Sequence, residues 1–352
     1  MRSRMPLIDA LKGISAQVIV LHHLASYGPI AEAMNLQLPA LTDWLYGYGR
    51  MAVQVFLVVA GFLAARGLAP EEVGIFANPA GLLWQRYLRL VRPFMVAMLL
   101  AIVAAAVARA WMQGDMPPEA PGLWQLVAHG LLLHGIFGVP SLSVGVWYVA
   151  IDFQLYTLLL GVLWFSSRSG NRAFSERALM ITVVVLLGIA ALFYWSRDDS
   201  LDTWAIYFFA SYAFGALSYW ASTRGRCGLW LVLLLVVGVL ALLQEFRLRV
   251  ALALATALLL GVTNRSGLLE QVPKNRLLAY LGQVSYSVFL VHFPVLLMVN
   301  AVFARFTDGN ASLGLAAALL AWMSSSVAGG IFYRYVESRK QWWPASVRPV
   351  QP

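Results

Sequence analysis

Long apolar runs separated by short polar segments cover most of the chain. Eleven runs could enter a membrane as helices, at residues 7–27, 44–66, 82–110, 123–137, 146–166, 178–196, 203–221, 229–244, 249–264, 279–304 and 311–334. A helix of about 20 apolar residues crosses the hydrocarbon of a bilayer and pairs all of its own backbone polar groups. The pattern therefore predicts an all-α, polytopic integral membrane helical bundle.

The fourth run, residues 123–137, decides the topology. Short cytoplasmic loops collect Lys and Arg, and Arg2, Arg4 and Lys12 place the start of the chain in the cytoplasm. If the fourth run crosses, most later basic loops fall outside; if it only dips into the bilayer, they fall inside. We therefore expect about ten transmembrane helices, one re-entrant or half-buried helix at 123–137, and both termini in the cytoplasm. A true eleventh span is the alternative.

Composition agrees with this class and excludes others. Of 352 residues, 61% are apolar and only 12% are charged, with a mean hydropathy of +0.73, whereas soluble domains have about 25% charged residues. The single cysteine, Cys227, excludes an intramolecular disulfide and a thiolate metal cluster. No other metal-ligand spacing occurs, so no metal is expected. We expect one transmembrane domain over residues 1–340 and a cytoplasmic tail over 341–352.

The net charge of +9 does not indicate a nucleic-acid partner. The basic residues lie in the short gaps between apolar runs rather than in one patch, which is typical of residues that orient a protein in a bilayer. We expect membrane lipids as partners and no nucleic acid, and the pattern specifies no oligomeric state. The first run has a basic start but lacks a convincing small-x-small cleavage site, so we interpret it as a retained helix.

Ionisable residues inside the predicted spans are the candidate functional residues, because charge in hydrocarbon is costly. Lys12 and His23 are eleven residues apart on the first helix, which is about 16 Å along the axis and a rotation of about 20° beyond three full turns. They therefore share a face, with a cation near the cytoplasm and a base deeper in the bilayer. His22 points about 100° away. Simple hydrogen bonding of the histidines to a neighbouring helix is the alternative.

Three arginines form a row at the start of the third run, in the segment QRYLRLVRP. Arg86, Arg89 and Arg92 have the spacing i, i+3 and i+6, so they cover about a third of the helix circumference near the inner surface. Guanidinium groups bind phosphates well, which predicts an anion-binding face. The alternative is that they only extend to lipid headgroups and set the topology.

Two further ionisable residues lie deep in later spans. Asp152, in VWYVAIDFQLY, lies among aromatic residues about a turn and a half from the outer end of its helix, so its carboxylate needs a histidine or arginine from another helix. A purely structural ion pair is the alternative. His292 precedes Pro294, which we expect to kink the helix, and irregular backbone at this depth lines cavities.

Several of these stretches together resemble the membrane-bound acyltransferase-3 family, whose members O-acylate sugars and other hydroxyl compounds. LIDALKGISAQVIVLHH is similar to its opening helix, GRMAVQVFLVVAGFLAARGL to its second helix, QRYLRLVRPF to its arginine motif, and VWYVAIDFQLY with LGQVSYSVFLVHFPV to two later signatures. The resemblance runs from about residue 7 to about residue 335. It departs at Lys12, where the family usually has arginine, and at Ala60, where it usually has serine.

The resemblance implies an inner-membrane O-acyltransferase, with acetyl transfer from cytoplasmic acetyl-coenzyme A to a hydroxyl of a cell-surface glycan or its precursor. It places the essential histidine on His23, as general base or transient acyl carrier, and its basic partner on Lys12. The arginine pair falls on Arg86 and Arg89. We expect Arg92 to contribute to the donor site, and Asp152 and His292 to orient the acceptor or the imidazole of His23.

Two other classes of function stay open. A multi-pass transporter or flippase would use the arginines to bind a phosphate and the histidines to relay protons, although the sequence shows no internal repeat with paired broken helices. A structural membrane protein would not require these polar residues to converge. The sequence does not distinguish acetyl from a slightly longer acyl group.

Overall fold

In the computed structural model, the described residues are 5–72, 78–112, 117–169, 173–223, 228–271, 275–307 and 310–339, and within these ranges there are helices but no strands. The predicted all-α membrane bundle is thereby confirmed as a fold class. Arg2, Arg4, Cys227 and the expected tail at 341–352 lie outside the described residues. The α-helices are α1 (Pro6–Leu24), α2 (Gly28–Gln37), α3 (Pro39–Tyr48), α4 (Ala52–Leu68), α5 (Pro79–Trp111), α6 (Leu123–Gly130), α7 (Val146–Ser169), α8 (Ala173–Phe193), α9 (Ala205–Ser222), α10 (Leu229–Gln244), α11 (Leu248–Ser266), α12 (Leu268–Gln271), α13 (Arg276–Thr307) and α14 (Gly314–Phe332).

Within the described ranges, eight helical stretches are long and apolar enough to cross a membrane. The other two expected spans correspond to α9, which is rich in Tyr and Ser, and to α10, which has 16 residues. The count of ten stays a prediction. At 123–137 the chain forms only the eight-residue helix α6, which is about 12 Å long and too short to cross. Residues 28–43, which fall between the first two predicted runs, are largely helical. Helices α2 and α3 each have proline in the first turn, where its missing N–H costs nothing.

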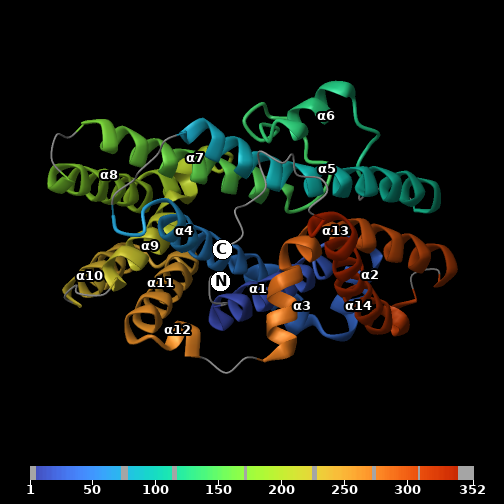
Figure 1. Ribbon diagram of the computed structural model, residues 1–352. Coiled ribbons are helices and arrows are strands. Elements are labelled where there is room, and N and C mark those ends of the chain that lie inside the picture. The colour runs from blue at the N-terminus through green and yellow to red at the C-terminus, as the bar shows by residue number, and fades with distance from the viewer. Residues whose placement is uncertain are drawn as a thin grey trace.

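The arrangement of helices brings distant parts of the chain together. Figure 1 shows α1 and α4 in the middle of the bundle, between a group containing α8, α10 and α11 and a group containing α13 and α14. The most extensive contacts are those of α4 with α9, α1 with α13, α13 with α14, and α13 with α5. Helix α13 continues through Pro294 without interruption. These contacts place α1, α5 and α13, whereas α7 is held mainly by α8 and α9; these four helices carry the candidate residues.

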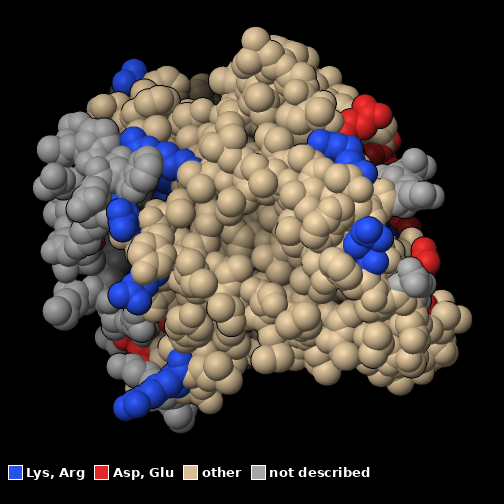
Figure 2. Space-filling model, turned by 90° about the vertical axis from the view of Figure 1, so that its right-hand side faces the viewer, with Lys and Arg blue, Asp and Glu red and all other residues tan. Residues whose placement is uncertain are grey.

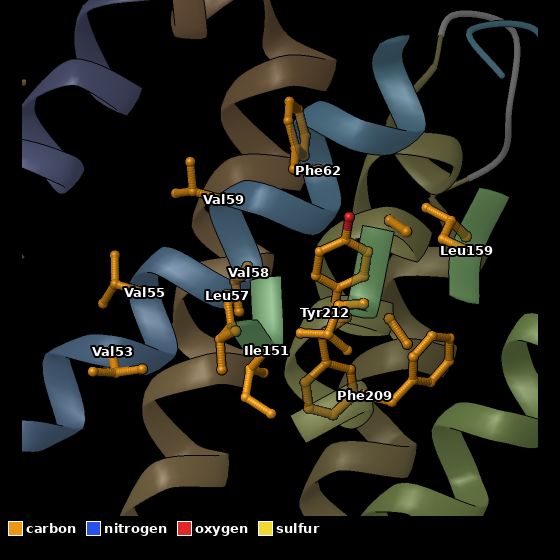
Figure 3. Packing of buried hydrophobic residues seen from close by; sticks show 14 of the residues in the cluster. Val53, Val55, Leu57, Val58, Val59, Phe62, Ile151, Leu159, Phe209 and Tyr212 are labelled. Carbon is orange, nitrogen blue, oxygen red and sulfur yellow. The ribbon is translucent and has the colours of Figure 1, made fainter. Parts of the chain in front are cut away.

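The largest buried cluster lies where α4, α7 and α9 meet. Figure 3 shows Val58 and Phe62 of α4, Ile151 of α7, and Phe209 and Tyr212 of α9 within it. Lipid tails are as apolar as these side chains, so close packing rather than release from water holds such helices together. Figure 2 shows one face of the molecule with no charged side chains over its middle and with Lys and Arg mainly along its left margin.

Two glycines allow α4 and α9 to touch backbone to backbone. A Cβ on Gly61 would overlap the carbonyl oxygen of Tyr212, and a Cβ on Gly215 would overlap that of Val58. Small residues at such crossings let helices in membranes approach closely. The position of Tyr212 in the bundle therefore depends on this crossing.

The substitution Gly61→Ala is expected to destabilise the protein by about 1–3 kcal/mol, because the added methyl group forces the two backbones apart. Gly67→Ala on the same helix is the matched control. A Cβ there meets nothing within 4 Å, so this change should be neutral or stabilising by up to about 1 kcal/mol. Thermal unfolding of the two variants in the same detergent measures the difference, and equal midpoints would contradict the close α4–α9 crossing.

Candidate functional site

The two histidines at the centre of the site come from α1 and α13. His23 Nδ1 lies 2.7 Å from His292 Nε2, and the two rings stack with centroids 4.9 Å apart and planes 7° apart. His292 is 1% exposed, whereas His23, at 8%, keeps a small accessible edge. Nearer the start of both helices, α1 packs tightly against α13, because Gly13 and Gly282 leave no room for a Cβ. The predicted base and the predicted orienting residue are therefore in direct contact.

The hydrogen bonds around this pair determine which ring nitrogens carry protons. His292 Nδ1 lies 2.7 Å from the carbonyl oxygen of Phe289, and a carbonyl only accepts, so this nitrogen carries a hydrogen. In the neutral ring, His292 Nε2 is then an acceptor, and His23 Nδ1 must donate to it. The second nitrogen of His23, Nε2, is therefore unprotonated and free to act as a base.

The neighbouring His22 has a different environment. Its Nδ1 lies 2.9 Å from the carbonyl oxygen of Leu45, to which it donates, and Gly49 packs closely against its Cβ. His22 thus ties the end of α1 to α3. We therefore predict that His22 supports the site, while His23, on which the resemblance places the essential histidine, performs the chemistry.

A second histidine pair, His129 and His134, lies in and after α6. Their rings stack with centroids 4.2 Å apart. His129 Nδ1 lies 2.7 Å from the carbonyl oxygen of Gln125, to which it donates, and its Nε2 accepts from the backbone N–H of Leu142. Burial lowers the pKa of His134 to about 4, so this ring is neutral at pH 7. Both nitrogens of His129 are used in holding the segment that leads into α7.

The carboxylate of Asp152 pairs with an arginine, one of the two partner types that the sequence predicted. Arg86 NH2 on α5 lies 2.5 Å from Asp152 Oδ2 on α7, and the guanidinium lies 5.2 Å from the ring centre of Tyr156. Asp152 is 4% exposed. The expectation that Arg86 lies near the inner surface stays a prediction, and the pair shows that its guanidinium meets a buried carboxylate. Most of its charge is therefore matched within the bundle.

A second group of charged residues lies next to this pair, since Arg89 is electrostatically coupled to both Arg86 and Asp152. Lys12 of α1, Arg89 of α5 and Glu337, in the π-helical turn after α14, are close enough to influence one another electrostatically. Ser287 Oγ donates to Glu337 Oε2 at 2.5 Å. Arg89 is exposed and Lys12 is half-buried. Asp9 on α1 is a second carboxylate near Lys12, so the two cations of this group face two carboxylates, and Arg89 is the cation at an exposed position. Arg92 is half-buried one turn further along α5.

Aromatic side chains connect the ion pair with the histidine pair. Tyr148, one turn before Asp152 on α7, packs edge-on against Phe289, with ring centres 5.4 Å apart. The ring centre of Phe289 in turn lies 6.1 Å from that of His292. Phe56 packs against the rings of Tyr148 and Phe289. The candidate residues therefore form three neighbouring groups, the Lys12–Arg89–Glu337 group, the Arg86–Asp152 pair and the His23–His292 pair, and the aromatic cluster joins the last two.

The sequence analysis did not identify some of the residues that belong to or adjoin these groups. Glu337 reads as one of several charges near the end of the last helix, and only the fold brings it to Lys12 and Arg89. Tyr212 also has no sequence signal, because tyrosines are common in this chain, yet its hydroxyl is buried without a hydrogen-bond partner. Among the described residues, no group of three or more His, Cys, Asp or Glu residues is arranged to hold a metal ion.

The comparison with protein families agrees with the resemblance seen in the sequence. Residues 6–333 match the profile of a family described as an acyltransferase domain. The chain is also 21% identical over 401 residues to a protein named Regulator of hypoxia-inducible factor 1 from Caenorhabditis elegans, a match that covers 96% of this chain and 79% of that protein. No solved structure matches the chain.

Proposed function

Because the chain belongs to the acyltransferase domain family, which matches residues 6–333, we propose that it moves an acetyl group from cytoplasmic acetyl-coenzyme A to a hydroxyl of a cell-surface glycan or its precursor. His23 is the general base in this reaction. The observation that carries the proposal is the hydrogen-bond chain from Phe289 O through His292 to His23, which leaves His23 Nε2 unprotonated. The proposed location is a bacterial-type inner membrane, with both termini cytoplasmic.

The reaction needs one proton transfer in each direction. His23 Nε2 takes the proton of the acceptor hydroxyl while the acceptor oxygen attacks the thioester carbonyl carbon. A carbon–oxygen bond forms, the carbon–sulfur bond breaks, and the leaving thiolate takes the proton back from Nε2. His292 keeps His23 in the correct tautomer throughout, and its Nε2 accepts from the His23 N–H when the imidazole becomes positive. His292 is thus a positioning residue in this proposal.

The phosphates of the donor are assigned to Arg89 and Lys12. Arg89 lies about three turns into α5 and Lys12 about two turns into α1, and the positive-inside rule places the start of both helices in the cytoplasm. Arg89 is exposed and can present two N–H groups to a phosphate, while Lys12 supplies a point charge. Arg92 extends the same row. Arg86 is paired with the buried Asp152, so we assign it to the part of the donor path that lies inside the bundle.

The substitution Arg89→Ala is expected to weaken acetyl-coenzyme A binding by roughly tenfold to a hundredfold, because a charge-assisted hydrogen bond is lost. Arg89→Lys should restore only part of the affinity, since lysine lacks the planar fork. Titration of acetyl-coenzyme A against purified protein measures both. Arg168→Ala is the matched control, since Arg168 stacks on Trp164 at the far end of α7 and should leave affinity unchanged.

A phosphate-free donor shows whether the effect comes from phosphate recognition. Acetyl-pantetheine has the thioester but no nucleotide phosphates, so Arg89→Ala should not change its KM. Equal losses with both donors would show that Arg89 acts on the fold instead. Comparison of surface-glycan acetylation in cells with and without the protein tests the acceptor class, and unchanged acetylation would contradict it. A transporter would leave the thioester intact in the purified system.

A further inference from the structure

Three buried polar atoms from three helices lack hydrogen-bond partners in the middle of the bundle. They are Arg86 Nε on α5, Asp152 Oδ1 on α7 and the hydroxyl of Tyr212 on α9. Tyr212 is completely buried, and its hydroxyl is electrostatically coupled to both charged groups. Figure 3 shows Tyr212 pointing into the bundle from α9. Buried polar atoms in native proteins are nearly always paired, and leaving one unpaired is costly.

The three unpaired atoms form a set that determines which hydrogen-bonding groups a ligand needs in order to satisfy them. Arg86 Nε–H and the Tyr212 hydroxyl can donate, and Asp152 Oδ1 can only accept. Arg86 and Asp152 are fixed relative to each other by their 2.5 Å ion pair, and Tyr212 is fixed by the glycine crossing of α4 and α9. A group with one N–H and one carbonyl oxygen satisfies all three, because its N–H donates to Asp152 while its oxygen accepts from Tyr212 and Arg86. A secondary amide is such a group.

The position of this set indicates which molecule supplies the amide. Arg89 is electrostatically coupled to both Arg86 and Asp152, and Tyr148 of the aromatic cluster that leads to His292 is coupled to the same two residues and to Tyr212. A donor whose phosphates are held at Arg89 and whose thioester reaches His23 therefore passes close to the set. The side chain of Arg86 is 25% accessible, whereas its Nε and the other two unpaired atoms are buried. The linker of coenzyme A between phosphates and sulfur contains two amides.

We propose that Arg86, Asp152 and Tyr212 form a subsite for an amide of the pantetheine arm of the acyl donor. This inference rests on the proposed function for the identity of the donor. The subsite sets the depth of the thioester by fixing the arm at one level. Tyr212 is then a binding residue that touches the donor and not the acceptor.

Binding of pantetheine to the purified full chain tests this subsite. Pantetheine has the amides but neither phosphate nor acyl group, so its affinity does not depend on Arg89 or on turnover. Tyr212→Phe should weaken pantetheine binding by roughly twofold to tenfold, the effect of losing one hydrogen bond. Tyr219→Phe is the matched control on the same helix, since the Tyr219 hydroxyl lies 3.4 Å from the carbonyl oxygen of Pro70, away from the set. It should leave binding unchanged.

A kinetic experiment compares two thioester donors, one with amides and one without, in the same two variants. The ratio of kcat/KM for acetyl-pantetheine to that for S-pentyl thioacetate, which has no amide, should fall in Tyr212→Phe and stay constant in Tyr219→Phe. Unchanged pantetheine affinity in Tyr212→Phe would overturn the subsite, and so would an equal loss with both thioesters. A raised KM for an octyl glucoside acceptor with unchanged pantetheine affinity would assign the set to the acceptor hydroxyl instead. Pantetheine binding that depends on Tyr212 without any acyl transfer would support the subsite and contradict the proposed function.

Discussion

The substitution His23→Ala is expected to reduce acyl transfer by roughly 10²- to 10⁴-fold, the contribution that a positioned general base typically makes. Folding should be retained, because the ring is at the end of α1 and loses one hydrogen bond, to His292. The initial rate of ester formation, divided by the amount of folded protein in the membrane, measures the effect. His23 is the residue on which the proposed proton transfer depends, so no other single side-chain change should cost as much rate without loss of folded protein.

The adjacent His22 provides the control for this prediction. His22→Ala removes the hydrogen bond to the Leu45 carbonyl oxygen and loosens α3 against α1, so it should lower stability more than rate per folded molecule. His292→Gln keeps an oxygen that can accept from His23 Nδ1 and should retain more activity than His292→Leu, which cannot. Full activity in His23→Ala would refute the mechanism. A larger loss per folded molecule in His22→Ala would exchange the roles of the two histidines.

The substitution Arg86→Ala is expected to destabilise the protein by about 3–5 kcal/mol, because it leaves the carboxylate of Asp152 buried without its partner. The side chain of Asp152 is only 5% exposed, so water cannot replace the guanidinium. The double variant Arg86→Met with Asp152→Leu removes both charges and should recover most of the lost stability while remaining defective in transfer. The free energy of unfolding, measured by titration with SDS in mixed micelles, gives both values.

A surface ion pair serves as the comparison for the buried one. Arg197 lies 3.2 Å from Glu245, and its side chain is 30% exposed, close to the 25% of Arg86. Glu245, however, is 52% exposed, so Arg197→Ala should cost at most about 1 kcal/mol. Similar losses for the two arginine variants would show that Asp152 is not isolated from water. A double variant no more stable than Arg86→Ala would show that the pair is not the source of the loss.

The sequence predicted the helices well because lipid imposes a simple rule on them. Runs such as 229–244 and 82–110 needed only enough apolar residues to cross, and they are close to α10 and α5. The requirement that Asp152 find a cationic partner was also correct, since an unpaired carboxylate is too costly at that depth. Helical periodicity likewise placed Lys12 and His23 on one face, but the facing helix could not be read from it.

The contacts that build the site could not be predicted, because they join residues far apart in the chain. His23 and His292 are separated by 269 positions, and neither the proline after His292 nor the lysine before His23 specifies that pairing. The spacing of Arg86, Arg89 and Arg92 predicted one face of a helix, but it did not indicate that Arg86 would pair with Asp152 on α7. Glu337 and Tyr212 have ordinary sequence surroundings, and only packing makes them part of the site.

Acyl transfer by the purified protein tests the central claim most directly. Acetyl-coenzyme A carrying a labelled acetyl group is incubated with octyl glucoside as the hydroxyl acceptor, and free coenzyme A thiol and labelled ester are measured in the same sample. The account predicts that the wild-type protein releases thiol and forms alkali-labile ester in equal amounts, and that His23→Ala forms neither above the buffer rate. Equal ester formation by the wild-type protein and His23→Ala, or an intact thioester with both, would contradict it.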